Sequence, residues 1–407
     1  EALKRSGRTI GLFRPVSRGD DQSDYILEVL LKHLWMPGPA SRYIGATYTE
    51  VHADPEGALS QIVVRYKQIE PDYDVMVILG SDYTDVATPT ELAYNARVAA
   101  NLGAPVLLVL GGRGHDENTP ANTQVIAGPA RTPDEIYQAT EIAVAELEAE
   151  HAQLFAVIAN RVDGEHLDAI VSAIERAVAD LGEIAVWALP EDRVLVAPTL
   201  RALMDALDGT LYRGDAELLD REALSVVVSG MSMENVLRRL EPDAAVIVPG
   251  DRSEVLVALM MAHGSETFPP LSGIIMNGGF EVSPVIERLI AGVASDLPIV
   301  ATELNTFESV FRVTRTRGRL AADSQRKTDI ALALFDKHVD CDRLLAMLEV
   351  ARDDIVTPLM FEYRLLEQAR ADPKHIVLPE GEDDRILRAA STLLQRQAAR
   401  LTILGDE

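Results

Sequence analysis

Short apolar runs alternate with amphipathic stretches through the first part of the chain. The runs Thr9–Phe13, Asp74–Leu79 and Pro105–Leu110 are compact hydrophobic segments, and parallel sheets bury such strands on both faces. Tyr25–Leu34 and Thr90–Leu102 place apolar residues at helical spacing. This alternation predicts an α/β protein with doubly wound, mostly parallel sheets in more than one domain.

The segments between these elements predict loops at the carboxyl ends of strands. Gly111–Pro133 contains Gly, Pro, Asn and Thr without periodicity and is expected to be a mobile loop. A helix is expected to begin at Thr132-Pro133, because proline suits the first helical position and acidic residues follow in the first turn. Gln153–Ala159 is predicted as a further strand, and it delivers Asn160 to its carboxyl end.

Four apolar runs in the second part of the chain are predicted as short strands that end in polar or glycine-containing turns. They are Val226–Val228, Ala245–Val248, Ile274–Met276 and Ile299–Ala301. The turns after the second and third runs hold Gly250, Asp251, Arg252, Asn277, Gly278 and Gly279. These turns predict either one anion pocket with Arg252 as its cationic arm, or structural turns in which Asp251 caps a helix. The sequence leaves both interpretations open.

The last part of the chain predicts a β-loop-α-β unit. Ile376–Leu378 is expected to form a strand, Pro379–Asp384 a tight acidic loop, and Leu401–Leu404 a second strand. Between them, apolar residues from Ile386 to Ala398 follow the 3.6-residue period of a helix. Another helix, beginning at Thr357-Pro358, is expected to precede this unit.

Composition narrows the classes of function. The chain has 407 residues, which fits two to three domains at about 150 residues each. Its 64 acidic and 38 basic residues give a net charge of −26, and such a field repels nucleic acids and anionic membranes. No nucleic-acid or membrane partner is therefore expected. An anionic ligand would need a local basic site or a helix N-terminus.

Cysteine and histidine usage adds two expectations. The single cysteine, Cys341, excludes an internal disulfide framework and fits a reducing cytosol. The eight histidines show no metal-ligand spacing, so no metal site is predicted. No signal peptide or apolar run of membrane length is visible. We expect a soluble, cytoplasmic protein.

Segments in three parts of the chain carry a specific resemblance. The segment Lys374–Arg385, with the following "ILRAA" and "LTILGDE", resembles the opening of the catalytic domain of the phosphate acetyltransferase (phosphotransacetylase) family. The segments "FRPVS", "ELAYNARVAANLGAPVLLVL" and "AVIANRV" resemble the dethiobiotin synthetase-like P-loop domain of the long form of that family. Asp251-Arg252-Ser253 matches the first two residues of the motif that names the DRTGG domain.

The resemblance implies four successive parts. A P-loop-like domain without its phosphate loop is expected over residues 1–207 and a DRTGG-like domain over residues 209–320. A helical connector follows over residues 321–373, and the start of a catalytic domain over residues 374–407. The chain is thus expected to be a fragment of a larger protein, in which the first two domains act in regulation and assembly.

The family interconverts acetyl-CoA plus phosphate with acetyl phosphate plus CoA, so CoA and acetyl-CoA are implied as substrates. The resemblance implies a homo-oligomer and no tightly bound cofactor. The family's catalytic base and oxyanion donors fall mainly beyond residue 407, and the chain alone is expected to be catalytically incomplete. Arg385 is the only candidate for an active-site or CoA contact. A surface ion pair with Glu382 or Asp383 is the alternative.

A nucleotide-like site is the remaining expectation for the first domain. The phosphate-cradling pattern GxxxxGK[ST] appears nowhere in the chain. Arg14 stands where relatives of this fold commonly carry lysine, and Asn160 at the strand end where related NTPases contact a purine. Asp82 and Asp85 could hold Mg²⁺. The alternatives are a strand-end cap for Asn160 and a solvated turn for the two aspartates.

Two other functions remain open at this point. The chain could be a non-enzymatic metabolite sensor or scaffold, with the turn Pro249–Glu254 as its ligand site. An ATP-dependent ligase of the dethiobiotin type would require the missing phosphate loop.

Overall fold

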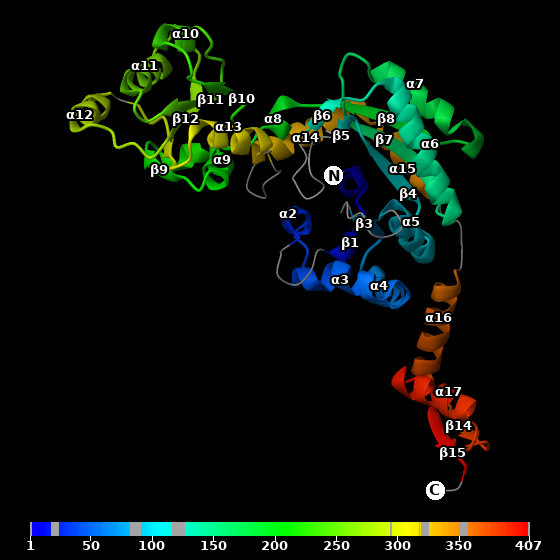
Figure 1. The fold of residues 1–407 in the computed structure, drawn as a ribbon. Coiled ribbons are helices and arrows are strands. Elements are labelled where there is room, and N and C mark those ends of the chain that lie inside the picture. Colours follow the sequence, from blue (N-terminus) through cyan, green and yellow to red (C-terminus); the bar gives the residue numbers. More distant parts are fainter. Residues whose placement is uncertain are drawn as a thin grey trace.

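The computed structural model describes residues 2–17, 24–81, 91–115, 127–293, 295–316, 318, 325–350 and 357–405. It is a mixed α/β structure in which most strand pairs are parallel, as predicted. Figure 1 shows two larger α/β regions and a small C-terminal unit at the far end of a helix. No helix in these ranges is both long and apolar enough to cross a membrane.

The first sheet has three parallel strands in the order β2-β1-β3. The strands are β1 (Ile10–Ser17), β2 (Ile44–Thr47) and β3 (Val75–Ile78). The helices around it are α2 (Tyr25–Leu34), α3 (Tyr48–Ala53) and α4 (Pro55–Ile69), with the 3-10 turns η1 (Ala40–Tyr43) and η2 (Glu70–Asp72), whereas α1 (Ala2–Arg5) contacts the later helix Cys341–Val350. Strand β1 is longer than the predicted Thr9–Phe13, because buried Arg14 and Ser17 continue it beyond the apolar run.

A second three-stranded parallel sheet follows in the order β4-β7-β8. Its strands are β4 (Val106–Gly111), β7 (Leu154–Val162) and β8 (Ala185–Pro190). The helices of this part are α5 (Glu91–Leu102), α6 (Pro133–Ala149) and α7 (Leu167–Ala177), with η3 (Ala179–Leu181). Helix α6 begins at the predicted residues, since Thr132 and Glu135 form a reciprocal capping box.

The prediction of a loop over Gly111–Pro133 was wrong at both ends of that segment. Strands β5 (Arg113–His115) and β6 (Ala127–Ala130) pair antiparallel there. Their short sequences, Arg-Gly-His and Ala-Gly-Pro-Ala, carry no hydrophobic alternation, so the pairing depends on the partner strand and not on local pattern. Residues 116–126 lie outside the described ranges.

The second region is a five-stranded sheet in the order β10-β11-β12-β13-β9, with only β9 antiparallel to its neighbour. Its strands are β9 (Thr210–Arg213), β10 (Ser225–Val228), β11 (Ala244–Pro249), β12 (Leu271–Asn277) and β13 (Ile299–Ala301). Its helices are α9 (Leu200–Ala206), α10 (Met233–Leu237), α11 (Ser253–His263), α12 (Pro284–Gly292) and α13 (Thr306–Arg315), with η4 (Ala216–Asp220). One core joins the sheet to α11 and α12, and a second core joins it to α9 and α13.

The chain returns to the first region after the five-stranded sheet. It leaves through α8 (Arg193–Val196) and comes back through α14 (Gln325–His338) and α15 (Cys341–Val350). Leu334 and Phe335 of α14 pack in one cluster with Phe155 and Trp187 of the β4-β7-β8 sheet. The five-stranded region is therefore inserted between two parts of the first region, joined to it near α8 and α14 (Figure 1).

The two chain crossings of this insertion lie side by side. The backbone N–H of Gly318 donates to the carbonyl oxygen of Val196 at 3.0 Å. The side chain of Lys327, 1% exposed, donates to Ala197 O at 2.6 Å. Burial lowers the pKa of Lys327, and the negative charge of Glu222 opposes this shift. Arg326 reaches the other region through Glu222 at 3.0 Å.

The C-terminal unit forms the predicted β-loop-α-β arrangement. Strands β14 (His375–Leu378) and β15 (Arg400–Ile403) pair parallel, with α17 (Asp384–Gln395) between them in the chain. Helix α16 (Pro358–Ala371) precedes the unit and contacts α4 and α5 of the first region. Thr357 caps α16 as predicted by accepting from Met360 N at 3.3 Å.

Candidate functional site at the carboxyl edges of the sheets

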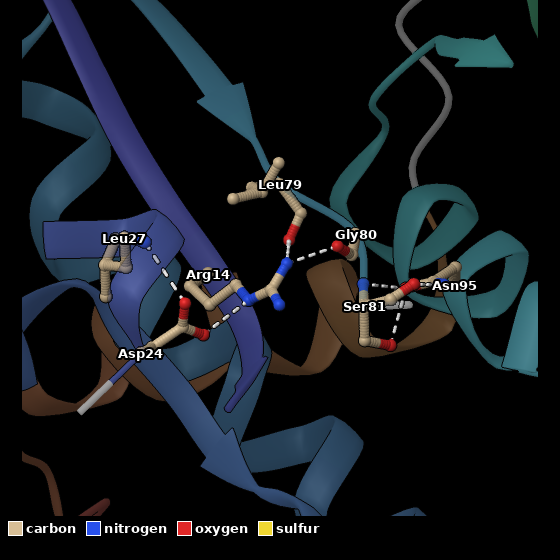
Figure 2. A network of polar contacts seen from close by, with 7 residues as sticks. All are labelled: Arg14, Asp24, Leu27, Leu79, Gly80, Ser81 and Asn95. Atoms are coloured by element: carbon tan, nitrogen blue, oxygen red, sulfur yellow. Dashed lines mark hydrogen bonds and ion pairs between the residues drawn. The ribbon is translucent and has the colours of Figure 1, made fainter. Parts of the chain in front are cut away.

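The carboxyl edge of the β2-β1-β3 sheet is built around Arg14 (Figure 2). Its side chain is 3% exposed and its Nε donates to Asp24 Oδ2 at 2.9 Å. Its Nη1 donates to the carbonyl oxygen of Leu79 at 3.2 Å and to that of Gly80. The guanidinium thus joins the ends of β1 and β3 to the start of α2 through groups of the chain itself.

Two further contacts close this edge. Asp24 accepts from Leu27 N at 3.1 Å and so caps α2. Asn95 of α5 accepts from Ser81 N at 3.0 Å and donates to Ser81 O at 3.0 Å, as Figure 2 shows. The predicted magnesium ligands Asp82 and Asp85 would follow Ser81, but they lie outside the described residues.

Asn160 lies on the other sheet of the first region, not beside Arg14. It pairs with Gly111 of β4 and Leu189 of β8, and β7 continues past it to Val162. Its backbone oxygen accepts from Gly112 N at 2.7 Å, while its side chain is exposed. Asn160 therefore lies inside the strand, close to the carboxyl edge, with its amide directed to solvent.

A cluster that the sequence analysis missed lies at the same edge. Arg113 Nη2 donates to Glu191 Oε1 at 2.8 Å, and Arg161 donates to Glu191 Oε2 from Nε at 3.0 Å and from Nη2 at 2.7 Å. We refer to Arg113, Arg161 and Glu191 as the arginine cluster. Its members are 78 and 30 residues apart along the chain, so no local motif could have revealed it.

In the second region, Arg252 is held by the chain around it. Its Nη2 donates to Met231 O at 3.0 Å and its Nη1 to Ser229 O at 3.3 Å, which ties the β11 turn to the turn after β10. Its Nε donates to Glu254 Oε1 at 2.7 Å, and this pair lowers the pKa of Glu254. Asp251 is exposed and forms none of the helix caps, since residue 252 precedes α11 without a side-chain cap.

The glycine turns of the second region are also closed by internal hydrogen bonds. Gly250 N donates to Asn277 O at 2.9 Å, Gly278 N to Leu304 O at 2.8 Å, and Gly279 N to Thr302 O at 3.2 Å. Gly278 and Gly279 have φ of 93° and 67°, a conformation that glycine adopts at low cost. The structure thus brings Gly250 and Asn277–Gly279 together, with their N–H groups directed into the turns.

Asn277 itself is 1% exposed and fastens two strand ends to α13. With its amide oxygen toward Thr306, it accepts from Thr306 N at 2.9 Å, and its nitrogen donates to Val248 O at 3.1 Å. Every polar atom of this side chain is thereby used for structure.

Arg385 lies on the surface of the C-terminal unit, and its side chain is 89% exposed. It donates to both oxygens of Asp383, from Nη2 at 2.7 Å and from Nε at 3.1 Å. This pair lowers the pKa of Asp383, which also caps α17. The geometry is that of the surface ion pair considered from the sequence.

The residues that the structure describes offer neither a cluster of metal ligands nor an activated thiol. No group of three or more His, Cys, Asp or Glu side chains lies in a metal-binding arrangement there. Burial raises the pKa of the Cys341 thiol, which keeps it protonated, whereas an activated nucleophile needs a lowered pKa.

Comparison with known families matches three successive parts of this architecture. The AAA domain matches residues 1–199, the DRTGG domain residues 202–316, and the phosphate acetyl/butaryl transferase family residues 360–407. The chain is thus a multi-domain α/β protein in which a segment similar to the phosphate acetyl/butaryl transferase family follows two regions similar to the AAA and DRTGG domains. In this order of domains and along its entire length, it resembles the long form of phosphate acetyltransferase. The resemblance predicted from the sequence is confirmed.

The similarity to relatives covers the whole chain but not the whole of each relative. Phosphate acetyltransferase of Nitratidesulfovibrio vulgaris is 28% identical over 416 residues, covering 100% of this chain and 57% of the relative. The enzymes of Synechocystis sp. and Deinococcus radiodurans are each 29% identical, covering 99% of this chain and 56% of their own length. This chain therefore spans little more than half the length of these relatives.

Among solved structures, similarity is found to the CBS and DRTGG domains of the regulatory region of Clostridium perfringens pyrophosphatase, crystallised with diadenosine tetraphosphate. The identity is 13% and the TM-score 0.25, with 56% of this chain and 86% of that one covered. A likeness at that score supports no argument about ligand or function.

Proposed function

We propose that this chain is the N-terminal portion of a phosphate acetyltransferase, which converts acetyl-CoA and phosphate into acetyl phosphate and CoA. The observation that carries the proposal is whole-chain similarity to relatives of that name, together with the acyltransferase match over residues 360–407. CoA and acetyl-CoA serve as substrates and not as tightly bound cofactors. Phosphate and acetyl phosphate are the other small-molecule partners.

The reaction needs groups that this chain does not supply alone. In the direction of acetyl phosphate synthesis, phosphate attacks the thioester carbonyl and the CoA thiolate leaves; in reverse, a deprotonated CoA thiol expels phosphate. Both directions need oxyanion donors and cations for phosphate. Arg385 is our candidate cation in the C-terminal unit, and its exposure leaves it accessible to a substrate.

The surface of the C-terminal unit supports the proposal that other parts of the whole protein supply the missing catalytic groups. Both faces of the two-stranded sheet and its helix expose apolar side chains, namely Ile376, Val377, Leu387, Leu394 and Ile403. Each of them is at least 38% exposed, whereas a finished α/β domain buries such strands under further helices. We infer that the remainder of an acyltransferase fold covers them in the whole protein.

The first and second regions would then act in regulation and assembly, within a cytoplasmic homo-oligomer. We keep the proposed domains as residues 1–207, 209–320, 321–373 and 374–407, with two refinements. The packing of α9 in the core of the five-stranded sheet supports placing the first border ahead of Leu200. The packing of α14 and α15 on the β4-β7-β8 sheet supports counting them with the first region.

The structure supports the candidate ligand-binding residues to different degrees. The exposed amide of Asn160 supports a nucleotide base contact, since it forms no hydrogen bond with the residues that the structure describes. Arg14 is enclosed by chain groups, which favours a structural role over a phosphate contact. Asp251 and Gly279 are the exposed members of the proposed pocket in the second region.

The test is phosphate-dependent release of CoA thiol from acetyl-CoA. It is run on the 407-residue chain and on the same chain followed by a complete phosphate acetyltransferase catalytic domain. Activity is expected only from the longer protein. Turnover by the shorter protein would overturn the regulatory assignment. Inactivity of both, with folding verified by circular dichroism, would favour a non-enzymatic sensor or scaffold.

A further inference from the structure

The arginine cluster places two cations around one carboxylate at the carboxyl edge of a parallel sheet. In open α/β sheets this edge is where ligands bind. The side chains of Arg113, Arg161 and Glu191 are 28%, 33% and 19% exposed, so solvent reaches all of them. The cluster is therefore accessible from outside without a change of fold.

The backbone beside the arginine cluster has an unusual conformation at Arg161. Arg161 has a φ of 63°, which is unusual for a residue other than glycine, and it interrupts the register between β7 and β8. Bulges of this kind redirect a side chain, and here the bulge turns Arg161 toward Glu191. Gly112 approaches the same bulge so closely that a Cβ would lie 2.7 Å from Arg161 O. A strained residue at a sheet edge is a feature to be explained by function.

The two guanidinium groups keep unused donors. Arg113 makes one hydrogen bond through Nη2, and its buried Nε has no partner in the part of the chain that the structure describes. Arg161 uses Nε and Nη2 but not Nη1. Since a guanidinium has five N–H donors, the pair can accept more anionic oxygens than Glu191 supplies.

The surrounding charges favour an additional anion. Arg131 lies at the same edge, where its Nη1 donates to Gly111 O at 3.2 Å. Asp163 is a further carboxylate within the electrostatic reach of Arg113, and it is paired with His166 at 3.1 Å. In a chain of net charge −26, two arginines that share one carboxylate, with Arg131 at the same edge, concentrate positive charge locally.

We propose that Arg113 and Arg161 form a binding site for a small anion with two or more adjacent oxygens, either a carboxylate or a phosphate group. Arginine binds both groups in the same two-point manner. Glu191 occupies this position in the ligand-free protein and competes with the anion. The proposal is independent of the acyltransfer activity, because it concerns a different sheet edge from the C-terminal unit.

The test is isothermal titration of the 407-residue chain with malonate and with inorganic phosphate, at low ionic strength. The key variant is Glu191→Gln, which keeps the shape of the side chain and removes the competing charge. It is expected to bind one of the two probes about tenfold more tightly than the unaltered chain, and the probe that gains identifies the ligand class. The variant Arg161→Gln is expected to lose binding at least tenfold.

A matched control is Glu183→Gln, which removes an exposed carboxylate that contacts Arg343 at 3.8 Å in the same region. It should bind like the unaltered chain. The proposal is overturned when Glu191→Gln binds neither probe, or binds them no better than the Glu183 variant does.

If Glu191→Gln does not fold, Arg113→Gln decides the matter. Millimolar binding by the unaltered chain that Arg113→Gln weakens at least tenfold supports the site. Equal binding by both, or none by the unaltered chain, overturns it.

Discussion

The two sheets of the first region both carry arginine at their carboxyl edges, and they use it in opposite ways. Arg14 is 3% exposed and is fixed by a carboxylate and by two carbonyl groups of the chain. Arg113 and Arg161 are about one-third exposed, share one carboxylate and keep unused donors. The first edge is closed and the second is open.

This difference shows that residue type alone does not identify a binding site. Arg14 lies in the buried strand β1 of a P-loop-like domain and was one of three arginines that the sequence singled out. Its burial makes it a structural residue, since a buried charge must be paired within the protein. Arg252 of the second region resembles Arg14 in being committed to chain carbonyls. The following predictions test the comparison, beginning with the largest expected effect.

The closed edge should depend strongly on its ion pair. Asp24→Ala leaves the Arg14 guanidinium buried without its carboxylate, and breaking a buried pair costs about 3–5 kcal/mol. Urea unfolding followed by circular dichroism measures the loss. Asp72→Ala is the control, because its pair with Arg42 is exposed, and little change is expected there. Equal effects of the two substitutions would contradict the description of this edge as closed.

The second region should resemble the closed edge. Asn277→Ala removes the contacts to Thr306 and Val248 and leaves a buried backbone group without a partner, at a cost of about 1–3 kcal/mol. Asn235→Ala serves as the comparison, since Asn235 is exposed and its side-chain amide donates to nearby Ser232 at 3.1 Å. If both variants have the same urea midpoint of unfolding as the unaltered chain, Asn277 does not stabilise the turn after β12.

The amino edge of the five-stranded sheet is expected to show a smaller effect, a dependence of stability on pH. His263 accepts from Leu271 N at 3.0 Å through Nδ1, which requires a neutral ring. Burial lowers the pKa of His263 below 6.5, an effect opposed by Asp296 and reinforced by Arg221.

The unfolded chain therefore binds a proton more readily than the folded one. The stabilisation is complete above about pH 6.5 and is lost as the pH falls from there through the folded pKa. Thermal unfolding between pH 7.5 and 5.5 measures it. His263→Asn keeps an acceptor without the titration and should show a weaker pH dependence. An unchanged pH dependence in this variant would remove His263 as the cause.

Substitutions in the arginine cluster at the open edge should lower the stability of the protein least. Glu191→Gln removes both partly exposed ion pairs of the cluster and Arg161→Ala removes one, so a loss below about 1 kcal/mol is expected for each ion pair. Urea unfolding under the conditions used for Asp24→Ala makes the comparison direct. A loss as large as that of Asp24→Ala would show that the arginine cluster is structural.

The sequence revealed the strands through their apolar runs, because burial on both faces leaves a local signature. Strand β13 coincides with the predicted Ile299–Ala301, and β3 lies within Asp74–Leu79. Strands β5 and β6 have no such signature, since their pairing depends on a neighbour brought in by the fold. The insertion of the second region was equally hidden, because the apolar face of α14 does not specify which sheet it will cover.

The candidate site shows the same limit more sharply. Arg252 and Asn277 were found because glycine turns mark the ends of strands. Glu191 was missed because its partners come from distant elements and from a bulge at Arg161, whose positive φ no sequence pattern announces. Local chemistry can be predicted locally, whereas a charge cluster assembled across a sheet edge requires the register of the strands.

The paired crossings at Val196 and Gly318 have a consequence for the modularity of the protein. Because these two points are joined by one hydrogen bond, the inserted sheet starts and finishes at a single place in space. A domain whose ends coincide can enter or leave a host without rearranging it. A direct join between Ala197 and Gly318 would excise the five-stranded region while the host kept α14, α15 and its own core. An unrelated domain with adjacent ends could be exchanged at the same position.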